Sequence, residues 1–227
     1  MLDDAGMNDV VRPKDTMPDR APTRPGRLVF YYGPMGAGKS TLALQTHFNQ
    51  SQQGRTGIMM TNRDRSGMAL VTSRIGLTAD AVLITETTDL HELINGLQAS
   101  AALSYVVCDE AQFLTGIQVD ALADLADTRG LDVFAYGLLT DFRSQLFPGA
   151  ARLTEIADEM HRMQAIVLCW CGRTAFMNAR IVDGHMVRDG AIVAVGDTVD
   201  APVRYRALCR RHFVSGQCGP AADTPTN

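Results

Sequence analysis

Between two polar ends, the chain alternates short apolar runs with longer segments in which apolar residues recur every three or four positions. The short runs have the pattern of β-strands, and the longer segments that of amphipathic helices. Strands are predicted at 27–32, 57–61, 81–85, 105–108 and 131–136, and helices at 39–52, 89–99 and 118–127. This alternation is typical of a parallel sheet with helices on both faces, so the predicted fold class is α/β.

The pattern changes after residue 160 and becomes β-rich. Residues 165–169 would form one more strand, and residues 179–195 have the pattern of a hairpin with an Asp-Gly turn and a second turn at 188–190. A chain of 227 residues accommodates one full domain and a smaller one. We therefore expect a disordered tail over 1–26, an α/β domain over 27–160, a small lobe over 161–214 and a flexible tail over 215–227.

Composition and charge narrow the classes of function. Hydrophobic residues make up 46% and charged residues 20% of the chain, as in ordinary globular proteins. The net charge of −4 provides no broad basic field, so no stable nucleic-acid partner is expected. No apolar run approaches the roughly 18 to 20 residues of a membrane helix, and no apolar signal follows the N-terminal charges. We therefore expect a cytoplasmic protein without a membrane partner.

The segment GPMGAGKS follows the first predicted strand and leads into the first predicted helix. It fits the phosphate-loop pattern G-x-x-x-x-G-K-[ST] in the required strand-loop-helix context. Backbone N–H groups would surround the phosphates of ATP, Lys39 would reach the β and γ oxygens, and the Ser40 hydroxyl would bind Mg²⁺. The alternative is a glycine-rich turn with a solvated lysine. The expected ATP site comprises Gly33, Pro34, Met35, Gly36, Ala37, Gly38, Lys39 and Ser40.

A pair of acids ends the apolar strand in YVVCDEAQ. Asp109 is placed to support Mg²⁺, and Glu110 to act as a general base on an attacking hydroxyl. Ala111 and Gln112 complete the expected ATP site. The alternative for the acids is a solvated strand end that caps the next helix. The letters DEAQ also occur in helicases, but that class needs a second motor domain and a basic track, which this sequence does not offer.

Cysteine and histidine cluster toward the C-terminus. A Cys-x-Cys pair and a Cys-x-x-His pair flank the predicted hairpin, and together they offer the three thiolates and one imidazole that suit tetrahedral zinc. The expected ligands are Cys169, Cys171, Cys209 and His212, which would hold closed a lobe whose core is too small to do so alone. The alternative is a set of reduced thiols in the core. Of the remaining cysteines, Cys108 is expected in the core and Cys218 as an unpaired thiol.

Together the motifs resemble the thymidine kinase family of the cytosolic phosphate-loop type, in particular its bacterial branch. The resemblance covers about residues 27–212 and rests on YYGPMGAGKST, SRIGL, DEAQFLT, YGLLTDFRSQLF, CWCGRTA and YRALCRRH, in this order. It implies transfer of the γ-phosphoryl of ATP to the 5′-hydroxyl of thymidine. It also implies structural zinc, a homotetramer and inhibition by thymidine triphosphate.

The resemblance further implies roles for individual residues. Glu110 is similar to the catalytic base of the family, and either Arg65 or Arg74 would touch the phosphates. Tyr205 resembles the tyrosine that ends the loop closing over the nucleoside. That loop, over 192–204, departs from the family pattern: the family often has two glycines shortly before the tyrosine, whereas here Gly196 is followed by Asp197 and a longer run that contains Pro202. The expected nucleoside contacts are Met35, Phe113, Leu138, Phe142, Phe147 and Tyr205.

The sequence leaves three alternatives. The phenylalanines among these residues would, on general grounds, be core residues. A phosphate-loop ATPase with a zinc module for nucleic acid would use a basic face, for which Arg206, Arg210 and Arg211 are the support. A nucleotide-binding scaffold would bind ATP and form no product.

Overall fold

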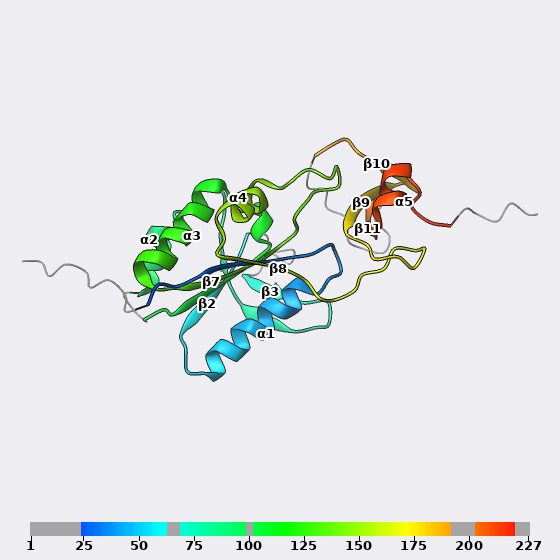
Figure 1. Ribbon diagram of the computed structural model, residues 1–227. Helices are drawn as coiled ribbons and strands as arrows, with labels where there is room; N and C mark the ends of the chain where they lie inside the picture. The colour runs from blue at the N-terminus through cyan, green and yellow to red at the C-terminus, as the bar shows by residue number, and fades with distance from the viewer. Residues whose placement is uncertain (1–23, 63–68, 99–101, 192–202, 221–227) are drawn as a thin grey trace, which may run out of the picture.

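The computed structural model describes residues 24–62, 69–98, 102–191 and 203–220. Its centre is a six-stranded sheet in the order β5-β2-β6-β7-β1-β8, with each neighbouring pair of strands parallel (Figure 1). The strands are β1 Leu28–Tyr32, β2 Gly57–Thr61, β5 Val82–Leu83, β6 Tyr105–Asp109, β7 Asp132–Gly137 and β8 Glu159–Arg162. The predicted α/β class is confirmed.

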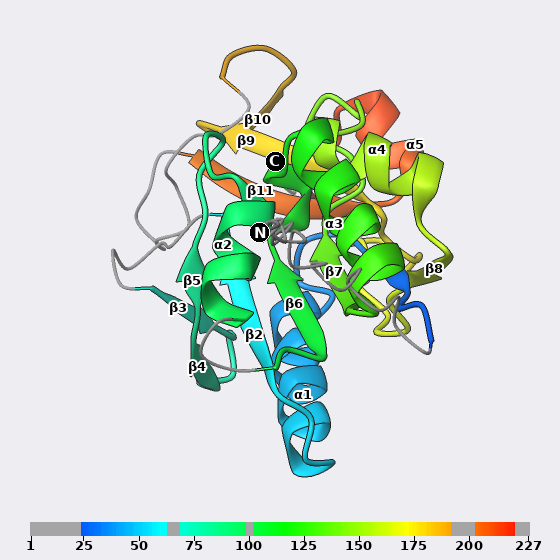
Figure 2. The same cartoon turned by 90° about the vertical axis from the view of Figure 1, so that its left-hand side faces the viewer.

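Helices cover both faces of this sheet. On one face, α1 packs against β2, β6 and β7, beside the antiparallel β3-β4 hairpin, while α2, α3 and α4 form a layer on the opposite face (Figure 2). These elements are α1 Lys39–Gln52, β3 Leu70–Thr72, β4 Thr78–Asp80, α2 Leu90–Gln98, α3 Gly116–Arg129 and α4 Pro148–Ile156. The short 3₁₀ helix η1, Ala111–Phe113, lies between β6 and α3.

The two-layer cover explains why the central strands are almost continuously apolar. Successive side chains of a strand point to opposite faces. Val29 of β1 therefore joins the cluster under α1, whereas Leu28 and Phe30 join the larger cluster under α2, α3 and α4. Cys108 is buried in that larger cluster, as expected for a core residue.

A small lobe lies at one end of the molecule (Figure 1). It consists of the antiparallel sheet β10-β9-β11 and helix α5. These elements are β9 Met177–Val182, β10 His185–Val187, β11 Val203–Leu208 and α5 Arg210–Ser215. The predicted hairpin is present, and Asp183 and Gly184 both have positive φ at its turn, 48° and 79°. That conformation matches a type I′ turn, for which Asp-Gly is a preferred sequence.

The strand predicted at 165–169 is wrong. This segment contributes only an isolated bridge between Leu168 and Thr174. Ile166 and Leu168 are 74% and 58% exposed, so their apolar character does not reflect burial in a sheet. The sixth strand of the large sheet is instead β8, which carries the polar sequence EMHR and pairs with β1.

Helix α3 begins two residues before its predicted start. The Thr115 hydroxyl accepts a hydrogen bond from the Gln118 N–H, while the Gln118 side chain accepts one from the Thr115 N–H. This reciprocal pair is a capping box, and it sets the start of the helix. The helix ends at Arg129 and is capped by Gly130, whose φ of 67° is typical of a C-terminal cap.

The expected tails fall largely outside the described residues, which omit 1–23 and 221–227. At the N-terminal side, the Gly26 N–H donates to the Ala126 carbonyl at 2.9 Å. At the other side, Ser215 ends α5. The predicted domain boundaries stay predictions. Within the described part of the chain, no helix combines the length and the apolar character that a membrane span requires.

Candidate active site

A cavity of about 540 Å³ opens where the carboxyl ends of the parallel strands meet. The loop after β1 and the acid pair at the end of β6 both reach it, because parallel strands bring these ends to the same edge of the sheet. Its lining includes Met35, Gly36, Gly38, Lys39, Ser40, Asp109, Glu110 and Leu138. The structure thus brings together the two motifs that the sequence predicts to act on ATP.

The loop from Gly33 to Ser40 has the backbone that a phosphate cradle requires. Gly36 and Gly38 have positive φ, 81° and 76°, and Gly38 is the N-cap of α1. The first N–H groups of α1 therefore face the loop, where they favour an anion. The Lys39 ammonium donates to the carbonyls of Pro34 and Gly33, at 3.1 and 3.4 Å. Of the other expected members, Ala37 is buried against the loop.

Asp109 and Glu110 occupy different positions in the cavity. The buried Asp109 carboxylate accepts a hydrogen bond from Ser40. Burial, reinforced by the nearby negative charge of Glu110, raises the pKa of Asp109 to about 6. A divalent cation beside Ser40 and Asp109 would favour the ionised carboxylate, so this pair fits Mg²⁺. Glu110 follows with a φ of 54°, which turns the chain out of the strand direction.

The remaining members of the DEAQ segment, Ala111 and Gln112, lie in η1 and are buried. Gln112 donates from Nε2 to Glu110 Oε2 at 2.5 Å, and its Oε1 accepts from the Leu138 N–H at 2.9 Å. The prediction that Gln112 belongs to the ATP site stays untested, and the structure shows its side chain bonded within the protein.

The β3-β4 hairpin forms another wall of the cavity, and sequence periodicity did not find it. Its strands have three residues each, too few for a period of two to be recognised. Arg74, in the turn of this hairpin, lines the cavity, and a Cβ placed on Gly36 would lie 3.9 Å from its guanidinium. Of the two arginines expected near phosphate, Arg74 is therefore beside the loop, while Arg65 lies outside the described residues.

The residues expected around the nucleoside lie in three different places in the structure. Met35 and Leu138 line the cavity with Glu110. Phe147 lies in the main core, and the Phe113 ring packs edge-on against it with centroids 5.4 Å apart. Phe142 and Tyr205 belong to a third group, which is joined by the buried Arg180 of β9. The guanidinium of Arg180 lies 3.7 Å from the Phe142 ring centroid, and its Nε donates to the Tyr205 hydroxyl at 3.0 Å.

One side chain connects the small lobe to the phosphate loop. Asn178 of β9 is 4% exposed; its Oδ1 accepts from the Met35 N–H at 2.8 Å, and its Nδ2 donates to the Thr140 carbonyl at 3.2 Å. Sequence reasoning missed this residue, because a single asparagine in a strand pattern does not reveal a partner 143 positions away. Most of the expected closing loop, residues 192–202, lies outside the described residues.

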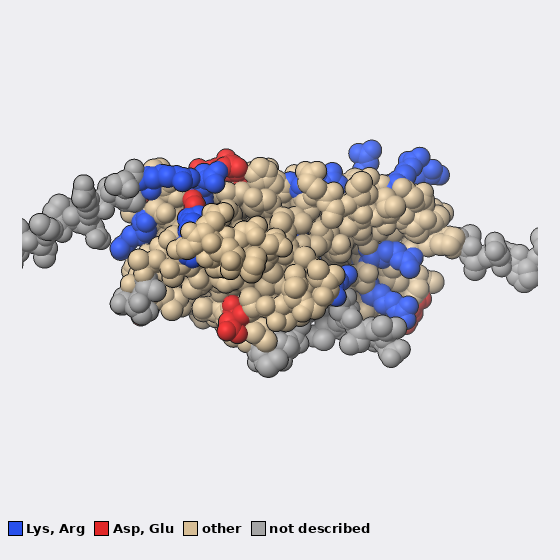
Figure 3. Space-filling view, turned by 90° about the horizontal axis from the view of Figure 1, so that it is seen from below, with Lys and Arg blue, Asp and Glu red and all other residues tan. Residues whose placement is uncertain are grey.

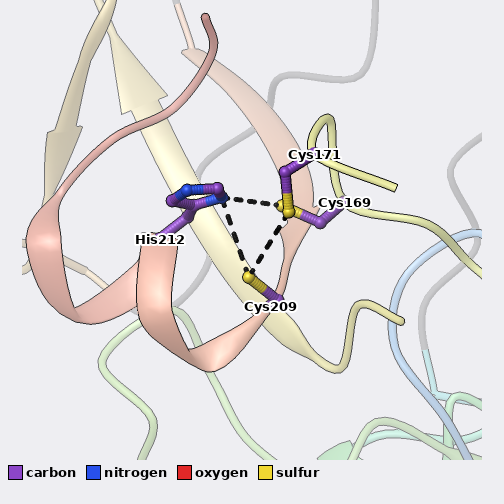
Figure 4. Close-up of side chains that lie close together, drawn as sticks. All are labelled: Cys169, Cys171, Cys209 and His212. Carbon is purple, nitrogen blue, oxygen red and sulfur yellow. Dashed lines mark hydrogen bonds between the residues drawn. The ribbon is translucent and has the colours of Figure 1, made fainter. Parts of the chain in front are cut away.

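The predicted metal ligands converge in the small lobe (Figure 4). The donor atoms of Cys169, Cys171, Cys209 and His212 lie within 4.8 Å of one another. His212 Nδ1 is 3.3 and 3.7 Å from the sulfurs of Cys169 and Cys209, and the sulfurs of Cys171 and Cys209 are 3.9 Å apart. Tetrahedral zinc, with Zn–S near 2.3 Å and Zn–N near 2.0 Å, places such atoms about 3.5 to 3.8 Å apart. The donor set and its spacing therefore fit zinc.

The environment of this cluster favours a thiolate. Burial alone would raise the pKa of Cys169, but the N–H groups of Cys171 and Cys209, together with His212, lower it to about 6. Trp170 stacks on the His212 ring with centroids 4.1 Å apart, and thereby holds the plane of the imidazole. Trp170 is thus a packing partner of the cluster.

Charge on the surface bears on the nucleic-acid alternative. On the face shown in Figure 3, Lys and Arg side chains form separate groups toward the two ends of the molecule, and the surface between them is mostly uncharged with a few acidic side chains. Arg206, Arg210 and Arg211 are exposed in the small lobe. Arg206 donates to the Cys218 carbonyl of its own chain. These observations do not favour a basic track for a polyanion.

Comparisons with known proteins agree with the motif resemblance. A family model described as thymidine kinase matches residues 26–213. Thymidine kinase from Cutibacterium acnes is 47% identical over 194 residues, covering 85% of this chain and 90% of that protein. The enzyme from Streptomyces coelicolor is 47% identical over 82% of this chain and 87% of its own. Thymidine kinase from Novosphingobium aromaticivorans is 46% identical, covering 82% of this chain and 96% of that protein.

Proposed function

The chain belongs to the thymidine kinase family, and on this premise we propose that it transfers the γ-phosphoryl of ATP to the 5′-hydroxyl of thymidine. The observation that carries the proposal is the cavity that joins the phosphate loop to Glu110 and Leu138. A phosphate donor and a hydroxyl acceptor must meet in one site, and this cavity is lined by both the phosphate loop and Glu110.

In this proposal the phosphate loop and the end of β6 hold the donor. Backbone N–H groups at Gly36 and Gly38 bind the phosphates, and Lys39 exchanges its contacts with loop carbonyls for phosphate oxygens. Ser40 and Asp109 would hold Mg²⁺, which supplies neutralisation of charge on the β- and γ-phosphates when bound. Arg74 adds a second positive charge beside the loop.

Glu110 then acts on the acceptor. Phosphoryl transfer has a loose transition state, so catalysis depends on positioning and charge stabilisation more than on covalent chemistry. Glu110 orients the 5′-hydroxyl and accepts its proton as the new O–P bond forms and the bond to ADP breaks. Met35 and Leu138 are the proposed walls for the thymine ring, and Phe113, Phe142, Phe147 and Tyr205 are the further contacts that the family resemblance predicts.

The small lobe has a supporting role in this proposal. Zinc on the four-residue cluster would stabilise a lobe in which, among the described residues, Leu208 and Phe213 are the large hydrophobic side chains of the buried core. The lobe in turn supplies Asn178 and Tyr205 to the site. Family membership also supports a homotetramer, inhibition by thymidine triphosphate and a cytoplasmic location, which remain proposals.

The test is a coupled assay of ADP release across a panel of nucleosides with wild type and Glu110→Gln. We expect thymidine to stimulate ADP release, and the variant to lose about 10²- to 10⁴-fold in kcat because it lacks the base. ATP affinity, measured by calorimetry, should be retained. Glu86→Gln, which changes an exposed carboxylate on the surface, is the matched control. Near wild-type turnover in Glu110→Gln would refute the base assignment.

A further inference from the structure

The segment Glu110 to Gln112 has a backbone that is unusual for its sequence. Glu110 has a φ of 54°, a region that non-glycine residues rarely adopt, and it serves as the N-cap of η1. Such a conformation persists only where surrounding contacts determine it. The turn brings the side chain of Gln112 back alongside the Glu110 carboxylate.

Gln112 makes complementary hydrogen bonds at both ends of its amide. Its Nε2 donates to Glu110 Oε2 at 2.5 Å, and its Oε1 accepts from the Leu138 N–H at 2.9 Å. A flipped amide would set its oxygen against a carboxylate and its NH₂ group against an N–H, so these partners determine the orientation. With 1% of Gln112 exposed, solvent cannot replace either partner cheaply.

The next strand leaves room for this arrangement. A Cβ on Gly137, the last residue of β7, would lie 2.8 Å from Gln112 Oε1 and 3.0 Å from its backbone nitrogen. These distances are too short for a side chain, so glycine at 137 permits the amide to sit between Glu110 and Leu138. The segments DEAQ and YGLL therefore form one hydrogen-bonded unit at the edge of the sheet.

We propose that Gln112 is the positioning residue for Glu110. Its amide holds the Glu110 carboxylate at a fixed distance from Leu138, a proposed wall of the nucleoside site. The inference rests on the proposed function and deepens it. A carboxylate with one oxygen held by a rigid amide has a fixed plane, so its approach to the acceptor hydroxyl is set before substrate binds. Misplacement of a catalytic group by about 1 Å can cost on the order of 10²-fold in rate.

The experiment is a double-mutant cycle in the full chain, with kcat and KM measured for thymidine and ATP. Gln112→Met preserves length and removes both hydrogen bonds. We expect a loss of about 10- to 100-fold in kcat, with the KM for ATP nearly unchanged. In the Glu110→Gln background, the same substitution should cause little further loss, because Gln112 acts through Glu110. Equal losses in the two backgrounds would overturn the proposal.

A second substitution separates the two hydrogen bonds. Gln112→Glu keeps an acceptor for the Leu138 N–H but sets a carboxylate against Glu110. We expect this variant to lose kcat, because the like charge displaces or protonates the Glu110 carboxylate; a kcat equal to that of wild type would show that the contact between residues 112 and 110 does not affect the rate. Gly137→Ala, which crowds the amide from β7 without altering it, provides an independent perturbation should the Gln112 variants fail to fold. It too should lower kcat only where Glu110 is present.

Matched controls address loss of structure. Gln118 is likewise a buried glutamine with both ends of its amide bonded, but it caps α3 away from the cavity. Gln118→Met should lower the melting temperature and leave kcat unchanged. For Gly137→Ala the control is Gly96→Ala, where a Cβ meets nothing within 4 Å. If wild type itself phosphorylates no nucleoside, the proposed function fails; if it is active and Gln112→Met equals it, only the positioning role fails.

Discussion

Asn178 is predicted to fasten the small lobe to the phosphate loop. Asn178→Ala removes the acceptor for the Met35 N–H and the donor to the Thr140 carbonyl, both in a buried setting. A hydrogen bond contributes about 1 kcal/mol net to the free energy of unfolding, and a buried group left without a partner adds to the loss. We therefore expect Asn178→Ala to lower the free energy of unfolding by about 2 to 3 kcal/mol. In a protein of this size that corresponds to a fall in melting temperature of roughly 4 to 12 °C.

The assay is thermal unfolding followed by circular dichroism, paired with ATP affinity from calorimetry. Asn95→Ala removes an exposed asparagine on α2 and serves as the control. Asn178→Asp is a sharper variant, because it keeps an acceptor for Met35 but adds a negative charge beside the loop expected to bind phosphate. It should weaken ATP binding more than Asn178→Ala does. An Asn178→Ala protein that melts with wild type would refute the reasoning.

The remaining predictions concern charge, metal and a helix cap. Lys39→Met should lower kcat by about 10²- to 10³-fold, because charge on the transferred group loses its counter-charge; unchanged single-turnover rates would contradict this. Purified, reduced protein should contain one zinc per chain by mass spectrometry of metals; Cys209→Ser should lose it and Cys218→Ser keep it, whereas metal retained in Cys209→Ser would exclude the cluster. Thr115→Ala should cost about 1 kcal/mol of stability through loss of the capping box, with kcat unchanged; an unchanged denaturation midpoint would show that the cap contributes nothing.

Local signals in the sequence predicted the parts of the fold that depend on neighbouring residues. The phosphate loop is a contiguous motif. The strand before it and the helix after it were predicted from the spacing of apolar residues and from the position of the glycines between them. The acid pair could be assigned to the same site because parallel strands share one edge. The Cys and His ligands were predicted from donor chemistry and the spacing of the two pairs, and the structure brings all four together.

The rest depended on contacts between distant segments or on weak patterns. Strand β8 is polar and lies at the sheet edge, so no apolar period reveals it, whereas the apolar segment 165–169 is largely exposed. The start of α3 was readable from the capping box at Thr115 and Gln118, a signal that apolar periodicity alone does not include. Asn178 and Gln112 make hydrogen bonds to residues that lie far away in the sequence. A single sequence does not reveal such contacts.

The most direct test of the central claim is the identity of the phosphorylated product. Wild-type protein incubated with ATP labelled at the γ-phosphoryl, Mg²⁺ and thymidine should yield thymidine 5′-monophosphate carrying the label, in equal amount to ADP, by mass spectrometry. Release of ADP and free phosphate with no labelled nucleotide, or label on any position other than the 5′-hydroxyl, would contradict the account.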